Sequence, residues 1–392
     1  MVSDQEIEMK SPKIKKIEIK RIQWQIKDCG PGTYSSWMTY NPGVNLSMGK
    51  HMTSIYTDYG VVGSYPISHD ISRIAHDLLG RNPLAREEIW QDFNKFHLGG
   101  LHASVDIILW DILGKMTDLS VSELLGGYRK KLPAYASTMN GGEEGLKGGL
   151  STPESYADFA EQCLEIGYKG FKIHPYPRPN IQDHINLIHA VADRVGGKMD
   201  LMLDAFNYYS TFADALKVGR ACDEAGFYWI EDPYFVGDGT TENGHQRLKE
   251  FLDTPLLQGE KVTGISGKMN MLLSGSTDFI RGNVNGDGIT GTKKLASAAE
   301  TVGADIEIHG VGPAQRHVMS AIGNSNYYEM VWVHPDIECL QLTSDIFLEG
   351  YEDGLEAVDA DGNVDVPDGP GMGVEWNWDA INKMTVGTKI ID

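Results

Sequence analysis

Three carboxylates stand at regular intervals in the second half of the chain, each at the end of a short apolar run. Asp204 ends MLD, Glu231 ends WIE and Glu260 ends LQGE, so that successive acids lie 27 and 29 residues apart. This spacing matches about one strand–helix unit, and the carboxyl ends of barrel strands converge on one mouth. Three acids brought together there would repel one another unless a cation lay between them. Carboxylate oxygens suit Mg²⁺, so the spacing predicts a magnesium site.

Basic groups flank these acids. The run FKIH, which precedes Asp204, carries Lys172 and His174 two residues apart, so in a strand both side chains point to the same side. The run DIEIHG ends in His309, and the following run NYYE ends in Glu329. Two basic groups on opposite faces of a metal-held substrate could transfer protons to and from it. A lone histidine or acid would more simply be a structural residue, but the shared positions at strand ends favour a catalytic site.

The elements that must position these residues alternate between strand and helix after residue 132. Thr152-Pro153-Glu154 is a helix start, because a capping hydroxyl precedes a proline at the first helical position. Gly167 is the expected end of that helix, and FKIH follows as a strand. Further strand-like runs, each apolar throughout, follow between helical segments as far as NYYEM. Such repeats predict a parallel sheet, and their number favours a closed barrel over an open sheet.

The first 131 residues have a different pattern and are predicted to form an α+β domain. Residues 14–26 alternate between polar and apolar types, which indicates a half-buried strand. The segment from about residue 29 to residue 50 is rich in Gly, Tyr and Ser, and it is too long for a tight hairpin. We therefore expect it to form an active-site lid loop and not a disordered segment. The tail from Gly350 breaks the alternation and is expected to return to the first domain. The predicted domains are therefore 1–131, 132–349 and 350–392.

The composition excludes several classes of function. A formal net charge of −21 repels nucleic-acid phosphates and anionic membranes. The 4 cysteines are far apart and form no CxxC pair, so neither a disulfide framework nor a zinc site is expected. We find no signal-peptide core and no apolar run of about 18 residues, and we therefore expect a cytoplasmic protein.

The chain resembles the enolase superfamily, and within it the mandelate racemase-like subgroup of acid-sugar dehydratases and racemases. HASVDIILWDILGKMTDLSVSELLGG is similar to that subgroup's segment between cap and barrel, and LMLDA, WIEDP and LLQGE are similar to its metal-ligand strands. DGITGTKKLASAAETVGADIEIHG resembles its sixth and seventh strand region, and VDVPDGPGMGVEW its C-terminal return. The resemblance implies an α/β fold, a modified TIM barrel of (β/α)₇β type with an N-terminal α+β capping domain that the C-terminal segment completes.

The resemblance also implies a reaction. Mg²⁺ on the three acids would stabilise an enediolate after removal of the proton α to a carboxylate, and loss of the β-hydroxyl of an acid sugar would give a 2-keto-3-deoxy acid. Lys172 would contact the substrate carboxylate, and Glu329 would hydrogen-bond its far oxygen. Either His174 or His309 would be the base and the other the acid. The candidate substrate-binding residues are Tyr34, Trp37, Asn207 and Asn283.

Three positions depart from the subgroup's pattern and leave other functions open. One is Phe206, which stands where relatives often have Asn. Lys172-x-His174 stands where many relatives carry Lys-x-Lys, and Asn283 stands where many carry the Asp that pairs with the seventh-strand histidine. A racemase, epimerase or cycloisomerase acting on a sugar acid or its lactone would use the same two basic groups, and a non-catalytic barrel is a third hypothesis. We expect a small carboxylate substrate as partner, no nucleic acid and no membrane, and a homo-oligomer.

Overall fold

Two sheets organise the chain. The computed structural model describes residues 11–32, 38–95, 100–142, 148–177, 180–234, 242–337, 346–348 and 350–392. Within these ranges the chain forms a four-stranded antiparallel sheet and a parallel barrel. This is the predicted fold class, a TIM-like barrel with an N-terminal capping domain.

The capping sheet joins the two ends of the chain. Its strands, in spatial order, are β13 (Thr385–Ile391), β1 (Ile14–Pro31), β2 (Met38–Thr57) and β3 (Val62–Ile67). Ile17 pairs with Ile391, so the C-terminal strand completes this sheet, as expected. The buried isoleucines of β1 face the core while lysines between them face outward, which is the physical basis of the alternation in the sequence.

The stretch from about 29 to 50, which we expected to be a loop, is mostly strand. The β1–β2 ladder runs from the pair Ile14 and Thr57 to the pair Pro31 and Met38, with an irregularity between Lys27 and Cys29. Two strands of this length satisfy each other's backbone groups, so the Gly- and Ser-rich composition does not prevent pairing. Residues 33–37 lie outside the described ranges, and a role of this ribbon as a lid stays a prediction.

The barrel is built from parallel strands that follow one another in the chain. Its strands are β4 (Lys131–Thr138), β5 (Gly170–Ile173), β6 (Asp200–Asp204), β7 (Trp229–Glu231), β8 (Leu256–Gln258), β9 (Phe279–Gly282), β10 (Ile306–Ile308) and β11 (Tyr328–Val333). The spatial order runs from β10 through β9, β8, β7, β6, β5 and β4 to β11. Since β10 also contacts β11, the sheet is nearly closed.

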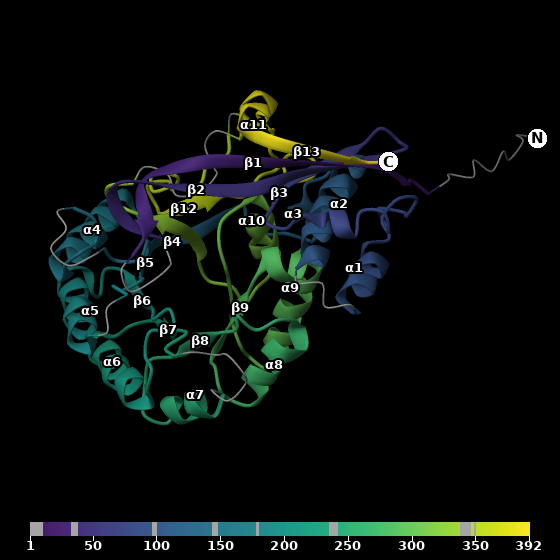
Figure 1. Cartoon of the computed structure of the whole chain (residues 1–392). Coiled ribbons are helices and arrows are strands. Elements are labelled where there is room, and N and C mark those ends of the chain that lie inside the picture. Colours follow the sequence, from purple (N-terminus) through teal and green to yellow (C-terminus); the bar gives the residue numbers. More distant parts are fainter. Residues whose placement is uncertain are drawn as a thin grey trace, which may run out of the picture.

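Helices connect successive barrel strands and cover them. They are α4 (Pro153–Ile166), α5 (Ile181–Val195), α6 (Phe212–Ala225), α7 (Glu242–Lys249), α8 (Ile265–Leu273), α9 (Val284–Thr301) and α10 (Pro313–Ser320). In Figure 1, α4 to α9 form a ring around the barrel strands, with the capping strands lying together above them in the view. A final strand without a helix of its own, β11, gives the predicted (β/α)₇β pattern.

The start of α4 shows how local sequence sets these helix boundaries. The Thr152 hydroxyl accepts a hydrogen bond from the backbone N–H of Ser155 at 3.1 Å, and Pro153 is the first helical residue. Gly167 ends the helix with a φ of 124°. Both residues were predicted as boundaries, because a capping hydroxyl satisfies a free N–H at the start and glycine tolerates positive φ at the end.

The capping domain is fixed to the barrel by helix contacts. Its helical elements are a 3-10 turn (Ile71–Arg73), α1 (Arg86–Lys95), α2 (Leu101–Thr117) and α3 (Val121–Leu124). On α2, the indole nitrogen of Trp110 donates to the Thr290 hydroxyl of α9 at 3.0 Å. Asp106 accepts from the same hydroxyl at 2.6 Å and from the Thr290 N–H at 2.8 Å. The cap therefore has a set position relative to the barrel.

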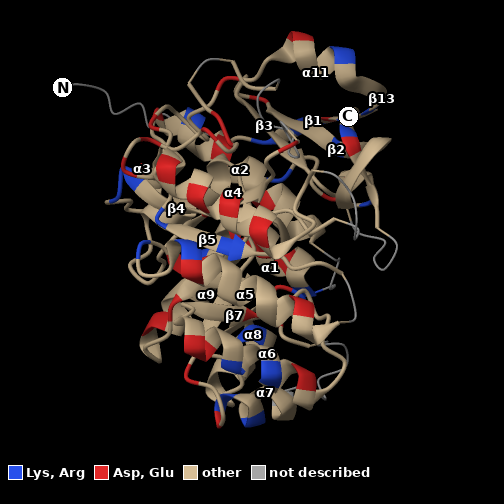
Figure 2. Cartoon of the chain, turned by 90° about the vertical axis from the view of Figure 1, so that its left-hand side faces the viewer, with Lys and Arg blue, Asp and Glu red and all other residues tan. Residues whose placement is uncertain are grey.

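The C-terminal segment after the barrel supplies two short elements before β13. They are β12 (Asn363–Asp365), which pairs with β4, and α11 (Trp378–Met384). Figure 2 shows acidic residues spread over several helices, with basic residues among them. Among the described residues, no helix has both the length and the apolar character needed to cross a membrane.

Candidate active site

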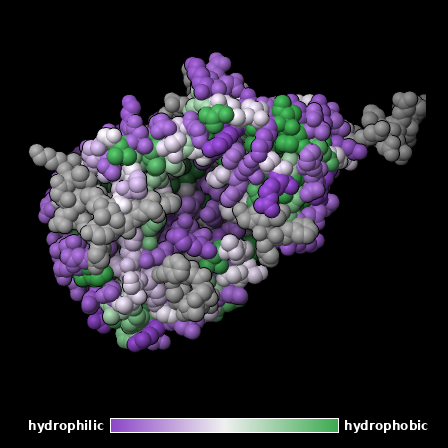
Figure 3. All heavy atoms as spheres, viewed as in Figure 1, coloured by the Kyte–Doolittle hydropathy of each residue, from purple (hydrophilic) through white to green (hydrophobic). Residues whose placement is uncertain are grey.

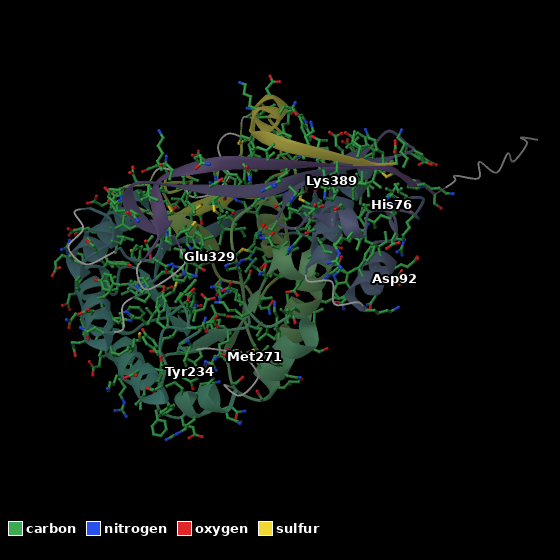
Figure 4. The ribbon with its side chains drawn as sticks, in the orientation of Figure 1. His76, Asp92, Tyr234, Met271, Glu329 and Lys389 are labelled. Carbon is green, nitrogen blue, oxygen red and sulfur yellow. The ribbon has the colours of Figure 1, made fainter. Side chains whose placement is uncertain are left out.

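The predicted catalytic side chains lie in the barrel interior, near the carboxyl ends of the strands. Figure 3 shows a hollow at the centre of the helix ring, with hydrophilic residues on its visible wall. In Figure 4, Glu329 lies within the barrel, below β1 and β2 in the view. Lys172, His174 and Asp204 are only 1%, 4% and 5% exposed. Charges at such buried positions interact more strongly than they would in water.

Lys172 and His174 point to the same side of β5, as their spacing predicted, and both reach Asp204. The Lys172 Nζ lies 3.5 Å from Asp204 Oδ2, and His174 Nε2 lies 2.9 Å from the same oxygen. Asp204 is the last residue of the neighbouring strand β6. Parallel pairing of β5 with β6 therefore brings an amine, an imidazole and a carboxylate together.

The Lys172 amine lies within a set of buried carboxylates. Its Nζ is 3.1 Å from Glu231 Oε2 and 2.5 Å from Glu329 Oε1. Burial alone would lower the pKa of Lys172, but the Glu231 and Glu329 carboxylates outweigh it and raise that pKa well above its ordinary value. Lys172 is consequently a permanent cation in this arrangement, suited to stabilising negative charge and not to accepting a proton.

His174 uses both of its ring nitrogens. Nδ1 lies 2.6 Å from the Thr138 carbonyl oxygen, and Nε2 contacts the Asp204 carboxylate. Both partners can only accept, so both nitrogens of His174 must donate in this arrangement. The Thr138 hydroxyl also accepts from the His174 backbone N–H at 3.0 Å, which fixes the residue beside β4. His174 is therefore placed as a proton donor.

The three predicted metal ligands differ in their surroundings. Asp204 Oδ1 accepts from the Phe206 N–H at 2.9 Å. Both oxygens of Glu231 contact the Arg281 guanidinium, with Nε 2.7 Å from Oε1. Glu260 lies two residues beyond β8 and its side chain is 25% exposed. Within the described part of the chain, no three His, Cys, Asp or Glu side chains are grouped closely enough to hold a metal ion.

The donor atoms of the mouth nevertheless fit a divalent cation. The described residues supply carboxyl groups at Asp204, Glu231, Asp232, Glu260 and Glu329 and cations at Lys172, Lys261 and Arg281. Burial and the neighbouring Glu231 carboxylate raise the pKa of Asp232 well above its ordinary value, which is the effect of several acidic groups held close together. Carboxylate oxygens are the ligands that Mg²⁺ prefers, so the chemistry of this donor set fits that ion.

His309 lacks the partner that a catalytic histidine often has. It follows β10, its Nε2 lies 3.9 Å from Glu260 Oε1, and its buried Nδ1 has no hydrogen-bond partner among the described residues. Asn283, predicted as a substrate-binding residue, caps α9, where its Oδ1 accepts from the Gly286 N–H at 3.1 Å, and its contact with a substrate stays a prediction. The reason for the cap is that a helix start needs such an acceptor. Asp287 pairs with Lys268 at 2.6 Å.

Glu329 lies deeper than we expected. We placed it at the end of a strand, facing the substrate, but β11 continues to Val333, so Glu329 is the second residue of the strand. Its Oε2 accepts from the Gly310 N–H at 2.8 Å, and its Oε1 accepts from the Ser137 hydroxyl at 3.2 Å in addition to contacting Lys172. Both oxygens are thus occupied by protein groups, and Glu329 positions Lys172.

Two cations of the site were not predicted. Arg281 is fully buried on β9 beneath the carboxylates, and an arginine within the apolar strand run DFIRGN was the available signal. Lys261 directly follows Glu260, a position that carried no signal by itself. The predicted residue Asn207 meets this lysine: with its amide oriented to satisfy both neighbours, its oxygen accepts from Lys261 Nζ at 3.0 Å. The remaining substrate-binding candidates, Tyr34 and Trp37, lie outside the described residues.

Comparisons with known protein families match most of the chain. A family model described as "Enolase C-terminal domain-like" matches residues 155–380. A second, described as "Mandelate racemase / muconate lactonizing enzyme, N-terminal domain", matches residues 53–126. Together these two matches cover the barrel after β4 and much of the capping domain.

Individual relatives catalyse different reactions. The chain is 27% identical over 322 residues to a 3,6-anhydro-alpha-L-galactonate cycloisomerase of Streptomyces coelicolor, which spans 79% of this chain and 81% of the relative. It is 25% identical over 323 residues to an N-succinyl-L-Arg/Lys racemase of Bacillus cereus, 80% of each chain. The structure of a D-glucarate dehydratase from Agrobacterium tumefaciens complexed with magnesium superimposes with a TM-score of 0.82 and 29% identity, covering 95% of this chain and 99% of that one.

Proposed function

Because this chain belongs to the enolase superfamily, in its mandelate racemase-like group, we propose that it is a magnesium-dependent dehydratase of acid sugars. It would remove the proton α to a carboxylate, form an enediolate and expel the β-hydroxyl to give a 2-keto-3-deoxy acid. One observation carries this proposal: Lys172 and His174 converge on Asp204 at the barrel mouth, so an electrophilic cation and a proton donor sit beside a predicted metal ligand.

Asp204, Glu231 and Glu260 would hold Mg²⁺, which when bound supplies Lewis-acid stabilisation of negative charge developing on the substrate carboxylate. The protein's own cations support the same charge. Lys172 stays protonated between Glu231 and Glu329, and its ammonium is held in place before any substrate arrives. A charge held in place in this way needs no reorganisation during the reaction, which is the main source of electrostatic catalysis.

The two histidines would divide the proton transfers. His309 is 29% exposed and its Nδ1 makes no hydrogen bond among the described residues, whereas both nitrogens of His174 are engaged. We assign His309 as the base that takes the α-proton. His174 would then protonate the departing β-hydroxyl, so that the C–O bond breaks with release of water. The resulting enol rearranges to the 2-keto acid, which balances the reaction as loss of one water.

A racemase or cycloisomerase is the second candidate, and the same two histidines favour it. In a racemase, one histidine would remove the proton from the α-carbon and the other would return it, with no loss of water; in a cycloisomerase, the C–O bond that breaks would belong to a ring of the substrate, so the oxygen would stay in the product. A dehydratase, a racemase and a cycloisomerase all occur among the relatives.

The test is incubation of the purified protein with Mg²⁺ and a panel of aldonic and aldaric acids and their lactones, followed by NMR in D₂O. A 2-keto-3-deoxy product formed from an open-chain panel member with loss of one water would support the dehydratase. Deuterium incorporation at the α-carbon with no loss of water would instead indicate the racemase. Failure of every panel member to exchange its α-proton or lose water would count against both.

A further inference from the structure

Lys261 occupies a distinctive position in the mouth. It directly follows the predicted ligand Glu260, in the segment between β8 and α8. Its side chain is 37% exposed, whereas Lys172 and Arg281 are 1% and 0% exposed. Among the described Lys and Arg side chains that contact the site's carboxylates, Lys261 is therefore the most exposed.

Residues from the two preceding strand ends surround this amine. Lys261 Nζ donates to the Asn207 amide oxygen at 3.0 Å, lies 3.7 Å from Asp232 Oδ2 and lies 4.9 Å from the centre of the Phe206 ring. Phe206 and Asn207 follow β6, and Asp232 follows β7. Among the described residues the ammonium thus has one amide acceptor, one loose carboxylate contact and one aromatic face, fewer hydrogen-bond acceptors than its three N–H groups can use.

The backbone that forms this setting is strained. Phe206, Asn207 and Asp232 have φ values of 50°, 59° and 41°, in a region that residues other than glycine rarely adopt. The Asn207 N–H donates to the Asp232 carbonyl at 2.9 Å, and the Ala205 N–H donates to the Glu231 carbonyl at 2.9 Å, so the two segments hold each other. Strained backbone of this kind persists where the surrounding structure enforces it, and it gathers at ligand sites.

We propose that Lys261 is a substrate-binding residue whose ammonium donates hydrogen bonds to an oxygen of the acid sugar. A structural salt bridge with Asp232 is the simpler role, but the 3.7 Å separation is too long for a hydrogen bond, and Lys261 stays 37% exposed although Asp232 itself is buried. The oxygen belongs either to a carboxylate or to a hydroxyl of the substrate, since both accept from an ammonium group. This assignment rests on the proposed function, because it needs an acid-sugar substrate.

The test compares wild type with Lys261→Met, which keeps the aliphatic stem and removes the charge, and with Lys261→Arg, which keeps the charge. Lys249→Met is the matched control, because Lys249 forms a partly exposed pair with Asp278, 2.6 Å apart, at the end of α7. For the Met variant we expect KM to rise about 10- to 100-fold, the range for one hydrogen bond to a charged group, with kcat changed less than about threefold. The Arg variant should recover part of this loss, and the control should match wild type.

Two further measurements separate the possible results. Calorimetric titration with Mg²⁺ alone should give the same affinity for wild type and Lys261→Met; a parallel loss of Mg²⁺ affinity would show that Lys261 supports the metal site and would overturn the assignment. An unchanged KM in an active Met variant would also overturn it.

The choice of substrates identifies the oxygen that Lys261 contacts. A rise in KM for aldaric acids alone would identify the terminal carboxylate as the contact, whereas a rise for both aldaric and aldonic acids would identify a shared oxygen. Wild-type inactivity on the whole panel would overturn the proposed function, and this assignment with it.

Discussion

Lys172 and Glu329 form a buried ion pair across the barrel interior, with 2.5 Å between Nζ and Oε1. Lys172 comes from β5 and Glu329 from β11, and β4 lies between these strands in the sheet. The lysine nearest the predicted metal ligands is therefore held from below by a carboxylate whose two oxygens both contact protein groups. Replacing either member should therefore disturb both the electrostatics of the site and the stability of the fold.

We expect Glu329→Gln to lower both stability and activity. Loss of the buried countercharge should destabilise the fold by about 3 kcal/mol. Because the Lys172 side chain would no longer be held in one position, kcat/KM should fall by about 10- to 1000-fold. Urea denaturation and steady-state kinetics measure the two effects. Ser137→Ala is the control, because it removes only the 3.2 Å hydrogen bond to Glu329 and should cost about 1 kcal/mol. Equal activity of Glu329→Gln and wild type would contradict this role.

The two histidines should be separable by isotope exchange. His309→Asn should abolish both product formation and exchange of the substrate α-proton with D₂O, because the proposed base is missing. His174→Asn should lower product formation by about 10²- to 10⁴-fold and leave exchange measurable. Proton NMR in D₂O follows both reactions in one sample. The opposite pattern, with exchange lost only in His174→Asn, would reverse the two assignments.

Removal of the bound metal ion, or of one of the side chains predicted to bind it, should abolish enzyme activity. Chelation by EDTA should abolish turnover, and addition of excess Mg²⁺ should restore it. Asp204→Asn should weaken Mg²⁺ binding at least tenfold in calorimetry, since the site loses one of its charged oxygen donors. Asp287→Asn breaks the buried pair with Lys268 and should lower stability without changing Mg²⁺ affinity. Normal Mg²⁺ affinity in Asp204→Asn would remove that residue from the ligand set.

Acid sensitivity of the fold should depend on His317. This residue is buried between the Ser122 N–H, which donates to Nδ1 at 3.0 Å, and the Met372 carbonyl, 3.0 Å from Nε2. Burial, with the nearby Arg316, lowers its pKa from 6.5 to about 4. Between these two values the unfolded chain binds a proton that the folded chain does not, so stability falls as the pH falls from 6.5 to about 4, by up to about 3 kcal/mol.

His317→Gln should weaken this dependence, since the amide does not titrate. The measurement is the urea midpoint at several pH values across the same window. His189→Gln is a suitable comparison, because the His189 side chain is 41% exposed on α5. The same loss of stability in acid for wild type and His317→Gln would show that other groups are responsible.

Local sequence determined most of the barrel elements and their order, although it did not reveal the strand pairing within residues 29–50. In the structure, α4 begins after the capping residue Thr152 and ends at Gly167, as the sequence predicted. The two-residue spacing of Lys172 and His174 placed both on one side, because side chains alternate along any strand. The placement of Asp204 and Glu231 at the last residues of β6 and β7 also followed from the sequence, since apolar runs mark buried strands.

Contacts between segments far apart in the chain were decided only by the tertiary structure. Glu329 lies under Lys172 because β11 continues past it, and strand ends are not marked in a run of apolar residues. The role of Asn283 as the cap of α9 was also not evident from its position in the sequence. Arg281 and Lys261 reach the carboxylates only because the barrel closes and brings successive strand ends together. Spacing along the chain therefore predicts which residues lie at the same end of the barrel. Packing between strands decides which of these residues contact one another and which remain exposed to a substrate.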